Sequence, residues 1–221
     1  MKFFQTALIA AALVLCSWLP ASAAAITDSA TYTPNTIIPD NNLNGISDTH
    51  TFNSSIQSIS DVQISFDISG GYAGDFYAYL RHGDTTFAVL LNRIGRTAGN
   101  SFGSSDSGIS LTLSSSGAAD VHGASAGGGT LTGLWQADGR NVDPLSALDS
   151  SPRNSLLNVF NGMDASGDWT LFVADTSSVG IGTLQDWSLS VSGFPVPEPG
   201  SLSLVLLGIG VIGLRFSKKA G

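Results

Sequence analysis

Residues 62–68 read Val-Gln-Ile-Ser-Phe-Asp-Ile, in which apolar and polar side chains alternate strictly. Successive side chains of a β-strand point to opposite faces of the sheet, so this order predicts a strand with one buried face. Further runs with apolar residues at alternate positions occur at 76–80, 87–91, 109–113, 131–135, 169–173 and 184–189. Their length of about five to seven residues is usual for strands. The sequence therefore predicts an all-β domain, either a sandwich or a barrel.

The segments between these runs are rich in Gly, Ser, Asn and Asp. The Gly-Asp pair at 83–84 predicts a hairpin turn between the runs at 76–80 and 87–91. Residues 95–108 and 114–129 are predicted to be loops, and only 155–160 favours a helix, of about one turn. The sequence shows no internal repeat and no second domain.

The first 23 residues have the pattern of a secretory signal peptide. Lys2 is followed by an apolar stretch at 3–19 and by the small residues at 21–23. We expect a signal peptidase to cleave after Ala23, with the two alanines that follow as alternatives. Because Cys16, the single cysteine, lies in this segment, the exported domain is expected to have neither disulfides nor a thiol nucleophile.

The other end of the chain has a second targeting pattern. Pro197, Glu198 and Pro199 precede an apolar stretch at 202–214, and basic residues follow it. The stretch is shorter than the roughly 20 residues that a membrane-crossing helix needs, and the basic residues favour the cytoplasmic side. This order resembles the PEP-CTERM signal of Gram-negative bacteria.

That resemblance implies a destination and a processing enzyme. In PEP-CTERM proteins an exosortase, which is a membrane protease, processes the tail, and the proteins reach the cell surface or the exopolysaccharide matrix. We therefore expect residues 201–221 to be a membrane-sorting tail with a short hydrophobic helix. Its part at 201–214 would be at least a transient membrane anchor.

The domain between the two targeting segments is strongly acidic. Residues 24–195 contain sixteen aspartates and five arginines, with no lysine and no glutamate, which leaves eleven net negative charges. Such a surface repels nucleic acids and anionic lipids, so we exclude both as partners. Aspartate without glutamate favours turns, caps and oxygen-rich metal loops over helices.

Several sequence blocks resemble a known family in their order and spacing. They lie at 38–42, 61–68, 72–76, 160–164, 167–175 and 182–189. Together they are similar to the P domain, also called the P/Homo B domain, of proprotein convertases and bacterial subtilisin-like proteases. We expect this domain to span 36–193, after a lead-in at 24–35 and before a Pro-rich linker at 194–200.

The P-domain resemblance implies a fold and a role. The family fold is a β-sandwich of jelly-roll type, and in these proteases the P domain supports a neighbouring catalytic domain without having a catalytic triad. The residues left beside this domain are too few for a subtilisin-like catalytic domain, so we expect none in this sequence. The resemblance therefore implies an accessory or adhesive module that is not itself an enzyme.

Two groups of oxygen-bearing side chains are candidates for a calcium site. The stretch 40–48 places them at positions one, three, five and nine, with Gly at six, as in the first part of a calcium loop, although position twelve is Thr51. The second group comes from the blocks that resemble the P domain. The candidate ligands are Asp40, Asn42, Asn44, Asp48, Asp75, Asp164, Asp168 and Asp175. The alternative is that these side chains cap turns or bind backbone amides.

A catalytic or zinc site is not expected. Residues 123–127 match the Gly-x-Ser-x-Gly pattern around Ser125, but they are flanked by loop sequence and not by the strand and helix that a nucleophile elbow requires. The three histidines are isolated in sequence, which argues against zinc. Trp169 and Trp187 are expected to anchor the core, whereas Trp135 and the tyrosines at 72, 77 and 79 are candidates for stacking on sugars.

Two functions follow from these observations. The first is an exported, non-catalytic module of the surface or extracellular matrix that binds protein or polysaccharide. The second is an accessory P domain that stabilises a separately encoded subtilisin-like serine endopeptidase. The expected partners are a signal peptidase, an exosortase-type enzyme, and an exopolysaccharide or a protease.

Overall fold

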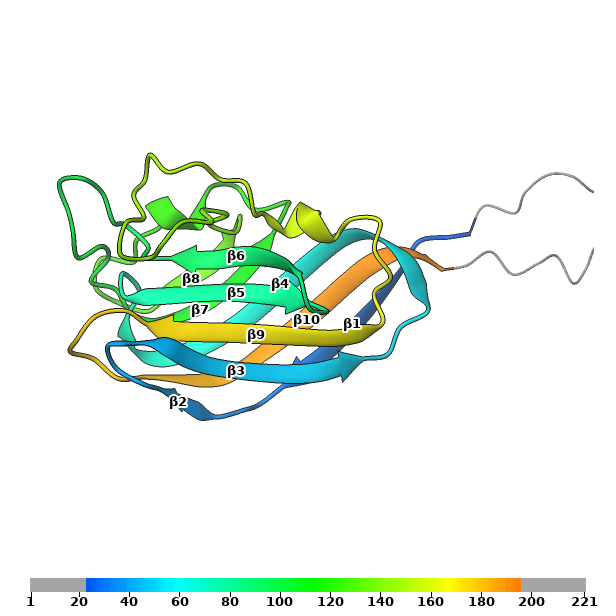
Figure 1. The fold of residues 1–221 in the computed structure, drawn as a ribbon, viewed down its shortest axis with the longest axis horizontal. Helices are drawn as coiled ribbons and strands as arrows, with labels where there is room; N and C mark the ends of the chain where they lie inside the picture. The colour runs from blue at the N-terminus through cyan, green and yellow to red at the C-terminus, as the bar shows by residue number, and fades with distance from the viewer. Residues whose placement is uncertain (1–22, 196–221) are drawn as a thin grey trace, which may run out of the picture. The chain divides into compact units, whose positions relative to one another are not determined.

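The computed structural model describes residues 23–195, which form two β-sheets packed face to face (Figure 1). The predicted all-β class is confirmed. The signal sequence before Ala23, the sorting motif at 197–199 and the predicted tail helix lie outside the described residues. Within residues 23–195, none of the helices has the length and apolar character that a membrane crossing requires.

The first sheet has six strands in the order β1-β10-β4-β7-β8, with β2 paired to the start of β10. Its strands are β1 Ile26–Tyr32, β2 Thr36–Ile38, β4 Ile56–Tyr72, β7 Ser107–Ser114, β8 Leu131–Trp135 and β10 Gly182–Pro195. The second sheet has the order β3-β9-β5-β6. Its strands are β3 Asn42–Phe52, β5 Phe76–His82, β6 Thr86–Asn92 and β9 Gly167–Asp175. β7 and β8 are parallel, and the other neighbouring strands are antiparallel.

Each alternating run of the sequence lies within one strand, and 62–68 forms the middle of β4. The predicted helical turn is the 3-10 helix η3, Leu157–Phe160, and a second one, η2, Val121–Gly123, lies in a predicted loop. β1, β2 and β3 were not predicted, because polar residues predominate in β1 and β3 and β2 is very short. β1 lies in the expected lead-in and pairs with β10 along its whole length.

The core lies between the sheets, and both predicted tryptophan anchors are in it. Trp169 on β9 and Trp187 on β10 are fully buried. The Trp169 indole donates a hydrogen bond to the Ala165 carbonyl at 2.9 Å, and the His82 ring stacks on it with centroids 4.2 Å apart. A buried indole N–H requires an acceptor, so each tryptophan fixes a second segment of the chain as well as filling the core.

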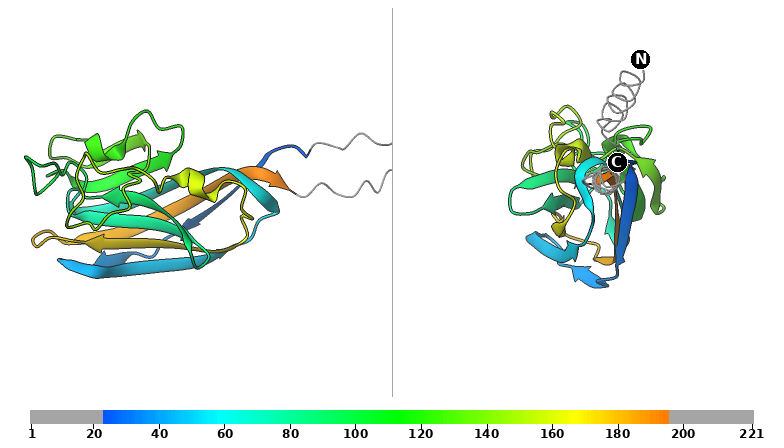
Figure 2. Two further views of the ribbon diagram at one scale, coloured as in Figure 1. Left: turned by 45° about the horizontal axis from the view of Figure 1, so that its top comes forward. Right: turned by 90° about the vertical axis from the view of Figure 1, so that its right-hand side faces the viewer.

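The strand ends define two opposite ends of the sandwich. At one end, here called the tip, β4 and β9 finish while β5 and β10 begin. At the other end β1 begins and β10 finishes, and Ile26 pairs with Gly193 there. The irregular chain between β8 and β9 covers the side of the sandwich next to β6 and β8, as two further views show (Figure 2).

Gly45 produces a bulge in β3 that no other residue type accommodates easily. Its φ is +49°, and the pairing of β3 with β9 shifts register between Asn42 and Ile46. A Cβ atom at this position would overlap the Val173 carbonyl oxygen. The glycine that the sequence assigned to the bend of a calcium loop therefore serves a strand bulge instead.

We expect Gly45→Ala to lower the free energy of unfolding by about 2–4 kcal/mol, because a strained φ and a backbone overlap act together. Gly83→Ala is the control: φ there is +60°, but nothing lies within 4 Å of the added Cβ. Gly83→Ala should lower the free energy of unfolding by about 1 kcal/mol. Urea unfolding measures the free energy of unfolding of both variants. Equal decreases would show that the close approach of Gly45 to the Val173 carbonyl does not contribute to the effect.

Candidate functional site

The eight side chains predicted to bind calcium do not form one site. Asn42, Asn44 and Asp48 belong to β3, and Gly45 is the bulge of that strand, so the predicted calcium loop is not formed. The Asn42 side-chain oxygen instead accepts a hydrogen bond from the Asn44 amide at 2.9 Å. The same short polar residues that suit a metal loop also stabilise a bulged strand start.

Asp48 is engaged inside the sandwich. Its Oδ2 accepts a hydrogen bond from the Trp187 indole at 2.7 Å and lies 3.0 Å from Nε2 of His50. The Tyr32 ring stacks on His50 with centroids 3.9 Å apart. Asp48 therefore serves as the acceptor that a buried tryptophan needs.

Asp164 and Asp168 lie at the end of the sandwich opposite the tip. Oδ1 of Asp164 accepts the Ser166 amide at 2.8 Å, and Oδ1 of Asp168 accepts the Thr51 hydroxyl at 2.6 Å. β9 separates them from Asp175, since seven residues of strand span roughly 23 Å. Asp164 thus binds a backbone amide of its own turn, as the alternative interpretation expected, whereas Asp168 binds a hydroxyl of the neighbouring strand β3.

Asp40, Asp75 and Asp175 come together at the tip. Asp75 is 7% exposed and Asp175 is 0% exposed, whereas Asp40 lies on the surface. Oδ1 of Asp175 accepts the Ser177 amide at 3.1 Å, but its Oδ2 has no hydrogen-bond partner among residues 23–195. Oδ2 of Asp40 accepts the Val179 amide at 3.3 Å, so both carboxylates bind the loop between β9 and β10.

These carboxylates also influence one another electrostatically. Burial raises the pKa of Asp175 to about 6, and the nearby Asp75 and Asp40 carboxylates contribute in the same direction. Burial also raises the pKa of Asp75, against the effect of Arg93, whose Nη2 is 3.7 Å from Oδ1 of Asp75. Within residues 23–195, no three His, Cys, Asp or Glu side chains are arranged to hold a metal ion as they stand.

Ser125 does not belong to a catalytic triad in the described chain. Nδ1 of His122 lies 2.8 Å from Oδ2 of Asp138, and its Nε2 lies 2.9 Å from the Arg96 carbonyl. Both ring nitrogens are thus engaged away from Ser125. Burial alone would raise the pKa of Asp106, but the amides of residues 128 and 126 and the hydroxyls of residues 104 and 125 lower it. The Gly-rich segment around Ser125 is thus a turn bound to a buried carboxylate.

His122 and Asp138 are part of a buried ionic network that the sequence did not predict. Arg140 Nη1 contacts Asp138 at 3.2 Å and Asp120 at 2.7 Å, and Arg153 donates to the Asp138 carbonyl at 2.9 Å. Burial alone would lower the pKa of His122, but its bonds to Asp138 and to the Arg96 carbonyl raise it. The sequence signal for this network was the amino-acid composition, because a domain with only five cationic side chains has few of them available for its surface.

A shallow hollow of about 480 Å³ lies beside this network. Thr97, Asp120, Trp135, Arg140 and Asp149 line it, among others. The Trp135 indole donates to the Thr132 carbonyl at 3.0 Å, which fixes the ring. Arg140 is hydrogen-bonded throughout, so the groups left to contact a ligand are the indole ring, a hydroxyl and carboxylates.

Of the three tyrosines predicted to stack on sugars, Tyr77 and Tyr79 pack against neighbouring rings, whereas Tyr72 is exposed. Tyr77 and Tyr79 lie on the outer face of β5, and Tyr79 stacks on Phe172 of β9 with centroids 4.7 Å apart. Tyr77 packs edge-on against the same Phe172 at 6.2 Å. These cross-strand contacts occupy the ring faces that a sugar would need, and they stabilise the sheet.

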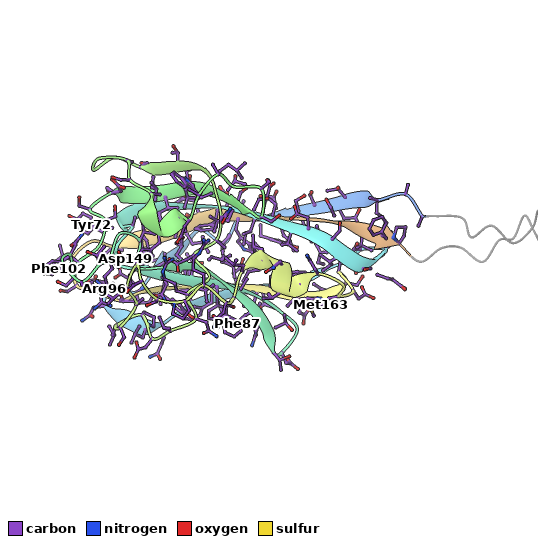
Figure 3. The ribbon with its side chains drawn as sticks, turned by 90° about the horizontal axis from the view of Figure 1, so that it is seen from above. Tyr72, Phe87, Arg96, Phe102, Asp149 and Met163 are labelled. Atoms are coloured by element: carbon purple, nitrogen blue, oxygen red, sulfur yellow. The ribbon has the colours of Figure 1, made fainter. Side chains whose placement is uncertain are left out.

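Exposed apolar side chains gather at the tip. They come from β2, β3, the end of β4 and two loops, and Figure 3 shows two of them, Tyr72 and Phe102, at the end of the molecule away from Met163. This tip patch consists of Ile37, Leu43, Tyr72, Phe102, Val179 and Ile181. The exposed fraction reaches 78% for Phe102 and 69% for Val179. Sequence reasoning missed the patch because its members lie in unrelated segments.

Comparison with known proteins bears on this architecture. Residues 129–191 match the family model of the proprotein convertase P-domain, and residues 195–219 match the PEP-CTERM protein-sorting motif. The chain carries a P-domain and a PEP-CTERM sorting motif. The P-domain match begins just before β8, includes η3 and β9, and ends within β10.

Among solved structures, the chain is similar to a serine protease of Aeromonas sobria. In its complex with the chaperone ORF2, the identity is 15%, the TM-score is 0.46, and the match covers 84% of this chain and 30% of that chain. In the structure of the protease alone the identity is 16%, the TM-score is 0.45, and the coverages are 82% and 29%. The chain thus spans under a third of these structures. No curated protein matches it.

We expect Asp138→Asn to lower the free energy of unfolding of the P-domain by about 3 kcal/mol, because it removes the buried charge that pairs with Arg140 and is hydrogen-bonded to His122. Asp143→Asn, at an exposed turn of the same irregular segment, is the matched control and should change it little. Urea unfolding followed by tryptophan fluorescence measures both.

The Asp138–His122 pair also predicts a pH dependence. Since the pKa of His122 is raised, its contribution to stability is complete below the unfolded value of about 6.5 and disappears as pH rises through the folded value. The free energy of unfolding should therefore fall from pH 6 to pH 9, and fall less in Asp138→Asn. The same slope in both proteins would contradict a charged His122.

Proposed function

We propose that the chain is an exported, non-catalytic module of the cell surface or extracellular matrix that binds protein or polysaccharide. The observation that carries this proposal is a P-domain followed directly by a sorting motif. The motif indicates export and implies processing by an exosortase-type enzyme. In the proposed route, a signal peptidase removes residues 1–23 during export, and residues 201–214 anchor the chain transiently in the membrane.

The strand order supports a jelly-roll type of sandwich. Along the chain, β3 lies in the four-stranded sheet, β4 lies in the six-stranded sheet, and β5 lies in the four-stranded sheet again. Setting aside β2 and β8, the two sheets have the orders β1-β10-β4-β7 and β3-β9-β5-β6. A chain that winds between two four-stranded sheets in this way has the double Greek-key connectivity of a jelly roll.

The non-catalytic role is supported by the surroundings of Ser125. Its hydroxyl lies at the Asp106 turn, and His122 is hydrogen-bonded to Asp138 and to a backbone carbonyl. A histidine that acts as the general base must have a ring nitrogen within hydrogen-bonding reach of the nucleophile. We therefore assign this region a structural role.

The tip patch favours a protein partner over a polysaccharide. Four of its six members are aliphatic, which suits a dry apolar interface, whereas sugars stack on ring faces. Val179 adopts a φ of +80°, which is rare for a β-branched residue and is typical of functional loops. Because the domain carries eleven net negative charges, we propose a partner with an apolar patch set in a basic surface.

The alternative is an accessory P-domain of a separately encoded subtilisin-like serine endopeptidase, a proteolysis-related role. The specific observation in its favour is the family match at 129–191. A subtilisin-like gene beside the coding gene, or co-purification with such a protease, would support it. The tip patch would then be the surface that contacts the protease.

The sorting proposal predicts the fate of a variant. Replacing Pro197, Glu198 and Pro199 with alanine should keep the protein in the membrane fraction, because the processing enzyme no longer recognises its tail. Intact mass of the protein recovered from its producer should show both termini removed in the wild type and the C-terminal segment retained in the variant. Identical masses would contradict processing at this motif.

The binding proposal predicts where a partner can be cross-linked. A photo-reactive amino acid in place of Ile181 should capture one defined cell-surface protein, and Phe102→Ser should reduce that capture at least tenfold. The same reactive residue in place of Phe194, which is 45% exposed at the opposite end, is the control.

Other outcomes would assign a different role. The protein could instead be retained on the producer's exopolysaccharide. If Trp135→Ala abolishes that retention and Phe102→Ser does not, the ligand is the polysaccharide and its site is the hollow. A captured protein that is a subtilisin-like protease would select the accessory role. Hydrolysis of a general protease substrate that Ser125→Ala abolishes would contradict a non-catalytic module.

A further inference from the structure

The tip contains a buried carboxylate oxygen with nothing bound to it. Asp175 ends β9 on the face that buries Trp169, Leu171 and Val173, so its side chain is directed into the sandwich. Oδ1 accepts the Ser177 amide, and Oδ2 has no hydrogen-bond partner within residues 23–195. A carboxylate oxygen removed from water without a substitute for its hydration destabilises the fold. A ligand from solution would supply that substitute.

The charges around this oxygen do not balance. Within residues 23–195, Arg93 is the one cation whose charge acts on Asp75 and Asp175, and the Asp40 carboxylate adds to their negative charge. The guanidinium is largely engaged elsewhere, since its Nε donates to the Gly74 carbonyl at 3.0 Å, and its closest approach to Asp75 is 3.7 Å. With the three carboxylates ionised, two negative charges remain, which a divalent cation neutralises.

The donor chemistry selects the cation. The three side chains offer only oxygen atoms, which hard cations prefer and zinc does not. They come from three separate segments, namely the loop before β3, the start of β5 and the end of β9. Mg²⁺ requires near-regular octahedral geometry, whereas Ca²⁺ accepts an irregular set of six to eight oxygens completed by water.

We propose that Asp75 and Asp175, joined by Asp40, bind one calcium ion at the tip. This site uses three of the eight predicted ligands. It omits Asn42, Asn44 and Asp48 of β3 and the two aspartates at the opposite end of the sandwich. Since the three carboxylates are not arranged to hold a metal as they stand, the exposed Asp40 closes onto the buried pair when the ion binds.

The ion would also order the tip patch. Asp175 and Asp40 accept hydrogen bonds from the amides of Ser177 and Val179, two residues of the same loop. A cation that joins the carboxylates holds this loop at two points. The loop carries Val179 and Ile181, so calcium binding would fix two apolar side chains of the patch, whatever partner the patch contacts.

The test uses the full chain, purified and stripped of metal with a chelator. Titration calorimetry with CaCl₂ should show one saturable site, and calcium should raise the Tm by several degrees, with a smaller effect from MgCl₂ at equal concentration. Hydrogen exchange of the amides at 176–181 should slow in calcium.

Three variants locate the site. Asp175→Asn should melt higher than the wild type in chelator, because a buried charge is gone, and should bind calcium at least tenfold more weakly. Asp40→Asn should weaken binding similarly with little change of Tm in chelator, since this side chain is exposed. Asp84→Asn, which removes the same charge from the exposed β5–β6 turn, should bind as the wild type does.

The proposal is overturned if millimolar calcium produces neither heat nor a shift in Tm. It is also overturned if Asp40→Asn binds calcium as tightly as the wild type, which would put the ion elsewhere. If Asp175→Asn does not fold, Asp40→Asn and Asp84→Asn decide the question by themselves.

Discussion

The fold depends on arginine side chains that satisfy the backbone of a long irregular segment. Between β8 and β9 the chain has little regular structure, so its buried carbonyls need donors from elsewhere. Arg140 donates to the carbonyls of Leu148 and Asp149, Arg96 to those of residues 144 and 147, and Arg153 to those of residues 137 and 138. Asp138 compensates the charge of Arg140 from a fully buried position. The absence of lysine from residues 24–195 fits this role, because the guanidinium offers five donors in a fixed plane.

The same segment protects an edge of the sandwich. β6 is the last strand of its sheet, and the amides of Asp138 and Gly139 bind the carbonyls of Leu90 and Val89. The Val89 amide in turn binds the Ser155 carbonyl. An exposed edge strand invites pairing with other chains, so this cover protects the β6 edge from such pairing. The ionic network therefore stabilises an edge as well as a loop.

The two ends of the sandwich then have different roles. β10 leads at Pro195 directly into the sorting motif, so the end where Ile26 pairs with Gly193 would be the attached end if the proposed anchor holds the chain. The tip carries the apolar patch, the strained Val179 and the three converging carboxylates. A module attached at one end and apolar at the other is suited to present a contact surface away from its anchor. The proposed calcium ion would regulate the order of that surface.

The sequence by itself determined the all-β class, the central strands and the tryptophan core, because apolar alternation and large aromatics report burial locally. It also determined the targeting motif, which is read as a contiguous pattern. It did not find β1 or β3, whose pairing with β10 and β9 compensates for weak local preference. It grouped Asp164 and Asp168 with Asp75 and Asp175, because their spacing carries no information about which end of a strand they occupy. Only tertiary structure decided which carboxylates meet, because strand direction brings Asp75 and Asp175 together and places Asp168 at the far end of β9.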